Sequence, residues 1–189
     1  MERGKIFIIS GPSGVGKGTI MDEVLKDKSL GLHRGINITT RKPRKGDEKN
    51  PHYIFIDKKT FLRMYHQGLI LEKDKHFGVY YGTSKIVLEK IVRQGKNALI
   101  EIDALNGSKV AKELPKATSI FIYCDRNELK KRLEDRRDDP KRVIEEKMER
   151  SKKELQMKSK YDYNVLNPEG KPEEAVTKVK EIIGKEINN

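Results

Sequence analysis

The sequence predicts a single α/β domain with a three-layer α/β/α core around a parallel sheet. Three observations support this fold class. Short apolar runs alternate with stretches of helical spacing, a glycine-rich loop follows the first run, and residues 37–94 break the alternation with short strands. A chain of 189 residues is long enough for one domain with a substantial core. We expect the interruption to form a lobe inserted into that core.

The expected elements follow the chain in order. Apolar runs typical of buried parallel strands occupy 5–10, 97–103, 118–124 and 163–166. Helical patterns occupy 19–26, 58–67, 85–94, 125–136, 140–159 and 172–187. Shorter strands are expected at 35–40, 53–56, 69–75 and 79–81, with a proline-containing loop at 41–51. Asp57 is the expected N-cap of the second helix, and Thr83 or Ser84 that of the third.

Composition excludes several classes of protein. The single cysteine, Cys124, has no internal partner and lies in an apolar run, so we expect a buried thiol in a reducing compartment. No signal-peptide pattern opens the chain and no apolar stretch reaches the ~18 residues of a membrane span, so a cytoplasmic protein without membrane contact is expected.

The net charge of +12 suggests anionic partners. Aromatic residues make up only 6% and no DNA- or RNA-reading motif is present, so we expect no stable nucleic-acid partner.

The run from residue 11 to 19 reads GPSGVGKGT and matches the pattern GxxxxGK between a strand and a helix. Its glycines let backbone N–H groups turn towards an anion, and the following helix N-terminus adds a favourable dipole. Lys17 is placed to reach the terminal phosphates of a nucleotide. This P-loop indicates a P-loop NTPase core and an ATP site. Its expected members are Gly11, Pro12, Ser13, Gly14, Val15, Gly16, Lys17, Gly18 and Thr19.

Gly18 occupies the place where many P-loops carry a hydroxyl for magnesium. Thr19 comes one residue later, so its hydroxyl is expected to serve an α-phosphate or a structural role. We therefore expect Mg²⁺ to be carried by ATP and held mainly by nucleotide and water, with no protein ligand assigned. The alternative is a glycine-rich turn that binds no ligand. Four glycines, the lysine and the flanking elements together disfavour it.

A second motif, TTRKPRKGD at 39–47, follows the second strand. Together with the P-loop, Tyr53, Glu72, YYGT at 80–83 and IEID at 100–103, it resembles the guanylate kinase family in order and spacing over nearly the whole chain. That family transfers a phosphoryl group from ATP to GMP. The resemblance implies a core at about 1–36, 95–125 and 160–189, a GMP-binding lobe at about 37–94 and a mobile helical lid at about 126–159.

The resemblance also implies a phosphate-binding set for GMP. Arg41 and Arg44 would bind the phosphate, since a guanidinium pairs with phosphate through two hydrogen bonds. Tyr53 and Tyr81 would donate hydroxyl groups. Asn37 stands where the family often has a phosphate-binding serine, and its amide can still donate. Taken alone, the two arginines could instead belong to a solvated basic loop, which is the usual place of such a charge run.

A carboxylate and a hydroxyl would read the base. Glu72 would accept from guanine N1–H and the exocyclic amine, and Thr83 would meet O6. Adenine fits this pair poorly, and such a mismatch discriminates strongly. Glu101 and Asp103, expected on one face of a strand end, would help hold the base, the ribose or hydrated magnesium. Each side chain alone has an ordinary structural explanation, and the agreement of the whole set favours binding.

The segment that resembles the lid departs from the family pattern. Family lids place arginines over the transferring phosphoryl group. The usual Arg-Gly-Thr-Glu reads RRDD at 136–139, and Lys147 replaces a later arginine with a point charge. Asn167, after the last strand, lies near the ATP adenine in the family, and a turn residue is the equal alternative. The expected catalytic residues are Lys17, Arg41, Arg132 and Arg136.

Two other functions are weighed against this one. A ribose 1,5-bisphosphate phosphokinase needs no guanine reader, so Glu72 and Thr83 weigh against it. A non-catalytic module of the kind found in scaffold proteins typically lacks an intact phosphate loop, so Lys17 weighs against it. We expect an enzyme of purine nucleotide metabolism that converts ATP and GMP, and also dGMP, to diphosphates. It would act as a monomer or homodimer.

Overall fold

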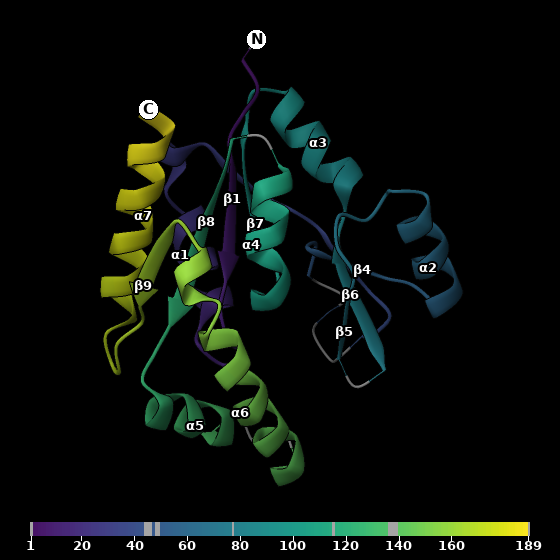
Figure 1. Cartoon of the computed structure of the whole chain (residues 1–189). Helices are drawn as coiled ribbons and strands as arrows, with labels where there is room; N and C mark the ends of the chain where they lie inside the picture. The colour runs from purple at the N-terminus through teal and green to yellow at the C-terminus, as the bar shows by residue number, and fades with distance from the viewer. Residues whose placement is uncertain are drawn as a thin grey trace.

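The computed structural model describes residues 2–43, 47, 50–76, 78–114, 116–135 and 140–188 (Figure 1). A five-stranded sheet forms its centre, and every neighbouring pair of strands is parallel. In spatial order the strands are β2 Leu32–Arg34, β7 Asn97–Glu101, β1 Ile6–Ser10, β8 Ala117–Tyr123 and β9 Tyr163–Leu166.

The central strand β1 is buried on both faces. Phe7 and Ile9 pack into one apolar cluster, whereas Ile6 and Ile8 pack into another, because alternate side chains point to opposite faces. Helices α1, α5 and α7 contribute to the first cluster, and α3 and α4 contribute to the second. The predicted three-layer α/β/α core with a parallel sheet is therefore confirmed.

The helices run close to the predicted positions, with one addition. Their bounds are α1 Lys17–Leu25, α2 Lys58–His66, α3 Lys85–Arg93, α4 Ala104–Glu113, α5 Arg126–Asp135, α6 Lys141–Leu155 and α7 Pro172–Asn188. Short 3₁₀ turns occupy Lys28–Leu30 and Lys158–Lys160. Asp57 caps α2 and Ser84 caps α3, each by accepting a hydrogen bond from a backbone N–H of the first turn. Among the described residues, no helix combines the length and apolarity needed to cross a membrane.

A second sheet lies beside the core together with α2, and we call these elements the small lobe (Figure 1). Its order is β4 Tyr53–Phe55, β3 Asn37–Thr39, β6 Val79–Thr83 and β5 Asp74–His76. Ile38, Phe61 and Ile70 form its apolar centre. Helix α3 falls within 37–94 but packs on the core sheet through Leu88 and Val92.

Three local predictions are wrong. Strand β2 was not expected, and the strand expected at 69–75 begins only at Asp74 and ends at His76. The strand expected at 97–103 ends at Glu101, because Asp103 is the N-cap of the unexpected helix α4. The carboxylates of Glu101 and Asp103 therefore do not share a strand face. Gly107 lowers helix propensity inside α4, yet a Cβ there would lie 2.2 Å from Ser10 Oγ, so only glycine permits this close packing.

Candidate active site

A cavity of about 590 Å³ lies at the carboxyl ends of β1 and β7, between the core, the small lobe and α6. Its wall is formed by the P-loop, by residues on or next to the four strands of the small lobe, and by one face of α6. This volume suits a small-molecule site. The carboxyl ends of parallel strands are also where α/β folds bind ligands.

Glycines give the P-loop a shape that other residues cannot adopt. Gly11, Gly14 and Gly16 have φ angles of 141°, 96° and 93°, in a region that favours glycine. A Cβ on Gly11 would lie 2.1 Å from the Ile122 carbonyl oxygen. Gly16 is the N-cap of α1 and has no side chain to cap the helix, so the helix N-terminus is available to an anion.

Most of the P-loop faces the cavity. Six of the nine P-loop residues line it, namely Gly11, Ser13, Gly14, Gly16, Lys17 and Gly18. Pro12 and Val15 are buried in the loop, and Thr19 is exposed outside the cavity lining.

The Lys17 ammonium is folded back over the loop. Its Nζ donates to the carbonyl oxygens of Gly11 at 2.7 Å and Pro12 at 3.1 Å, and it lies 3.6 Å from Glu101 Oε1. Ile9 pairs with Glu101 in the sheet, so the ends of β1 and β7 bring the cation and the carboxylate together. An anion in the loop can take over this ammonium, because a phosphate is a stronger partner than a neutral carbonyl.

Two further candidates lie behind the P-loop and outside the cavity lining. Asn167 is buried, and its Nδ2 donates to the Val15 carbonyl at 2.7 Å. Arg132 Nη1 donates to the same carbonyl at 3.2 Å, and its Nη2 donates to the carbonyls of Asn167 and Pro168 at 3.3 Å. Both side chains therefore brace the loop in this structure. Neither the adenine contact of Asn167 nor the catalytic role of Arg132 is tested by these contacts, and both stay predictions.

The small sheet aligns several candidates by its strand register. Tyr53 pairs with Asn37 on the neighbouring strand, and Asn37 pairs with Thr83 on the next. Tyr81, two residues before Thr83, shares its side of the strand. Asn37, Tyr53 and Tyr81 line the cavity. Burial and the Glu101 charge raise the pKa of Tyr53, and hydrogen bonding with Asn37 partly offsets this.

Glu72 lines the cavity and is paired with Thr83, which is buried and lies outside the cavity lining. The Thr83 hydroxyl donates to Glu72 Oε1 at 2.9 Å. Glu72 Oε2 is also buried, and no hydrogen-bond donor from the described residues reaches it. Burial raises the pKa of Glu72 to about 7, and the bond from Thr83 only partly opposes that rise. The pair thus contains one unsatisfied acceptor, on a side chain that lines the cavity.

Arg41 is turned towards Asp47. Its Nη1 donates to Asp47 Oδ2 at 2.6 Å and to the Lys42 carbonyl at 2.9 Å. The guanidinium carbon lies 5.8 Å from the ring centroid of Tyr53 and 5.1 Å from that of Phe55. The hydrogen bond to Asp47 raises the pKa of Arg41. Arg44 and Arg136, both expected in the site, lie outside the described residues.

Helix α6 supplies cavity residues that the sequence analysis did not select. Arg150 and Glu154 line the cavity beside Lys147. Arg150 Nη2 donates to Asp103 Oδ2 at 2.6 Å, and its Nε donates to Glu154 Oε1 at 2.7 Å. Positions 147, 150 and 154 follow the i, i+3, i+7 spacing of one helix face. This spacing was a signal that would have extended the expected site beyond Lys147.

The residues present fit a magnesium ion carried by a nucleotide. Glu101 and Asp103 both line the cavity next to the P-loop. Mg²⁺ prefers hard oxygen ligands and keeps several waters, so such carboxylates suit it through bridging water. A Cβ on Gly18 would meet nothing within 4 Å, so the loop is open there but offers no hydroxyl.

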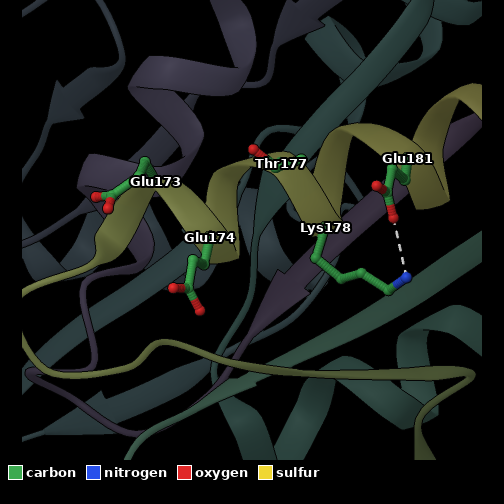
Figure 2. A pocket seen from close by; sticks show the side chains of 5 residues that line it. All are labelled: Glu173, Glu174, Thr177, Lys178 and Glu181. Carbon is green, nitrogen blue, oxygen red and sulfur yellow. Dashed lines mark hydrogen bonds and ion pairs between the residues drawn. The ribbon is translucent and has the colours of Figure 1, made fainter.

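A second, shallow hollow of about 370 Å³ lies along α7, and no residue of the P-loop lines it. Figure 2 shows its side chains projecting from a single helix: Glu173, Glu174, Thr177, Lys178 and Glu181. Lys178 pairs with Glu181 at 2.9 Å. The set is the solvated face of a helix, and we assign it no chemistry.

The family model for guanylate kinase matches residues 3–186. The chain belongs to the guanylate kinase family. A guanylate kinase of Listeria innocua is 37% identical over 183 residues, which cover 96% of this chain and 88% of that protein. One of Fusobacterium nucleatum is 38% identical over 170 residues, covering 89% and 91%. The crystal structure of guanylate kinase from Anaplasma phagocytophilum is 27% identical with a TM-score of 0.79, covering all of this chain and 88% of that one.

Proposed function

We propose that this guanylate kinase family member transfers the γ-phosphoryl group of ATP to GMP, and also to dGMP, giving ADP and the nucleoside diphosphate. The observation that carries the acceptor assignment is Glu72 Oε2, a buried oxygen without a donor among the described residues, in the same cavity as the P-loop. Guanine N1–H and its exocyclic amine are the donors such an oxygen requires. Adenine has no proton on N1, so it would leave the carboxylate unpaired.

On the donor side, the P-loop backbone and the α1 N-terminus would hold the phosphates of ATP. Lys17 would leave the carbonyls of Gly11 and Pro12 and move to the terminal phosphates. Arg132, with Arg136, would stabilise charge on the transferring group, and Asn167 would lie near the adenine. An oxygen of the GMP phosphate forms the new bond to phosphorus as the bond to ADP breaks, with no enzyme intermediate.

On the acceptor side, Arg41 and Arg44 would bind the GMP phosphate with Asn37, Tyr53 and Tyr81. Thr83 would meet guanine O6, for which its hydroxyl must turn away from Glu72. Glu101 and Asp103 would hold Mg²⁺ through water, or contact the base and ribose. The ion, when bound, neutralises charge on the bridging phosphates. The proposal places the reaction in the cytoplasm, with the chain as a monomer or homodimer.

The assignment is tested by ADP release from ATP with five acceptors: GMP, dGMP, AMP, UMP and ribose 1,5-bisphosphate. We expect turnover with GMP and dGMP, and kcat/KM for AMP and UMP lower by at least about 100-fold. Equal turnover of GMP and AMP would contradict the assignment of the acceptor. Preferred use of the sugar phosphate would support the alternative kinase, and ATP turnover with no acceptor would exclude both.

A further inference from the structure

Arg150 joins three parts of the molecule. It projects from α6, and its Nη2 lies 2.6 Å from Asp103 Oδ2 at the start of α4 and 3.4 Å from Asp74 Oδ2 on β5 of the small lobe. Its Nε binds Glu154 on its own helix at 2.7 Å. One guanidinium therefore contacts carboxylates from the core, the small lobe and α6.

The cluster is shielded from solvent. The side chains of Asp103, Asp74 and Glu154 are 13%, 15% and 4% exposed, and that of Arg150 is 27% exposed. Burial raises the pKa of Asp74, but hydrogen bonding with His76 and the charge of Arg150 outweigh it and hold that pKa below the ordinary value. Loss of the guanidinium would leave several carboxylates close together with little solvent to screen them.

The contact fixes the orientation of Asp103. Its Oδ1 accepts the backbone N–H of Leu105 at 2.9 Å as the N-cap of α4, and its Oδ2 accepts from Arg150. Both oxygens are thus committed in directions set by two different elements. Asp103 lines the cavity beside Glu101, so its orientation shapes the acceptor side of the site.

Arg150 also supplies the positive charge that these acidic groups need. Asp74, His76 and Asp103 offer ligand atoms within 4.8 Å of one another, which is a spacing compatible with a metal ion. The guanidinium already lies against both aspartates. Arginine keeps its charge at every physiological pH, so the described structure contains a permanent cation at this point.

We infer that Arg150 is a positioning residue for the acceptor nucleotide: it holds Asp103 in place and links α6 to β5 of the small lobe. The inference rests on the proposed function, because it assigns the acceptor side of the cavity to GMP. It adds a residue that acts through Asp103 and Asp74 rather than through direct contact with substrate.

The test compares R150A, R150K, D74N and the double variant R150A/D74N with wild type, at saturating concentrations of the second substrate. For R150A we expect KM for GMP to rise about 10- to 100-fold, with KM for ATP changed less than about threefold. R150K should recover only part of the loss, because Arg150 holds Asp103 and Asp74 through Nη2 and Glu154 through a separate Nε, and a lysine ammonium offers a single nitrogen. The double variant should be little worse than R150A alone, since the two changes remove the same link.

R142A is the matched control. Arg142 lies on the same helix, its side chain is 83% exposed, and it pairs with Glu146 at 3.6 Å. R142A should leave both KM values and the melting temperature near wild type.

Equal rises in both KM values, a lower melting temperature with unchanged kinetics, or additive effects of R150A and D74N would overturn the inference. If R150A fails to fold, D74N alone decides, since it weakens the link to the small lobe and leaves Asp103 paired. Absence of GMP turnover by the wild-type protein would instead overturn the proposed function, so the two failures are distinguishable.

Discussion

The Thr83 hydroxyl donates to Glu72 Oε1 at 2.9 Å, while Glu72 Oε2 in the same buried carboxyl group has no donor among the described residues. Thr83 reaches this position on β6 and Glu72 just before β5, so the small lobe builds the pair from two adjacent segments. A buried oxygen without a partner costs free energy in the free protein. A ligand that supplies the missing donors recovers it.

Replacement of Glu72 by glutamine tests that relationship. Glutamine has nearly the same shape, but its NH₂ group would face the N–H donors of guanine. We expect E72Q to lower kcat/KM for GMP by at least about 100-fold and to leave KM for ATP within about threefold of wild type. Steady-state ADP release with each substrate varied in turn measures both. A parallel loss for ATP would show that Glu72 supports the whole site rather than the base.

Acceptor binding should depend on the protonation of Glu72. Its pKa is raised to about 7 by burial, so the carboxylate form that accepts guanine N–H groups is lost below that pH. We expect kcat/KM for GMP to fall as pH drops from about 8 to 6. The GMP phosphate itself titrates near pH 6. E72Q is therefore the control. Only the pH dependence that wild type shows and E72Q lacks is attributed to Glu72.

The same carboxyl group should make the free protein less stable at higher pH. Its pKa rises from an ordinary value of 4.5 to about 7 on folding. Between those values the unfolded chain loses the proton first, so stability falls as pH rises through this window. The loss amounts to roughly 3 kcal/mol at most. In urea unfolding without nucleotide, the free energy of unfolding of E72Q should rise relative to that of wild type between pH 5 and pH 8. An equal difference at both pH values would contradict this account.

Asp47 should orient Arg41 for the phosphate of GMP. Their side chains are 16% and 15% exposed and joined at 2.6 Å, which favours a fixed geometry over a solvated pair. We expect D47A to raise KM for GMP about tenfold, with little change in KM for ATP. The control is E89A, which removes an exposed ion pair with Arg93 on α3 and should change neither constant. Unchanged KM for GMP in D47A would show that Asp47 does not position the arginine.

Sequence patterns predicted the elements that depend on residues adjacent in the sequence. The apolar run before the P-loop, the glycines of that loop and the caps Asp57 and Ser84 lie where expected. Helix α4 was missed because its Gly107 reflects close packing against Ser10 of β1. The residues next to Gly107 in the sequence do not reveal this reason for a glycine.

The site was predictable where motifs are contiguous and less so where elements meet from a distance. Asn37, Tyr53 and Thr83 come together through strand register. Arg150 reaches Asp103 across 47 positions of sequence, and only the three-dimensional arrangement of α6 brings them together. Arg132 carries the charge expected of it but contacts backbone behind the P-loop. Charge is readable from sequence, whereas the direction of a long side chain depends on its neighbours.

The conformation of the P-loop should be sensitive to one methyl group at Gly11. At φ 141° a Cβ would lie 2.1 Å from the Ile122 carbonyl oxygen, and Ile122 is held in β8 by its pairing with Val165 of β9. We expect G11A to lower the free energy of unfolding by about 3 kcal/mol or more. G18A is the matched change in the same loop, since its Cβ meets nothing within 4 Å. It should be neutral or stabilise by up to about 1 kcal/mol, because alanine favours helix. Urea unfolding of both variants separates the two outcomes, and a G11A protein as stable as G18A would show that the loop relaxes around the added carbon.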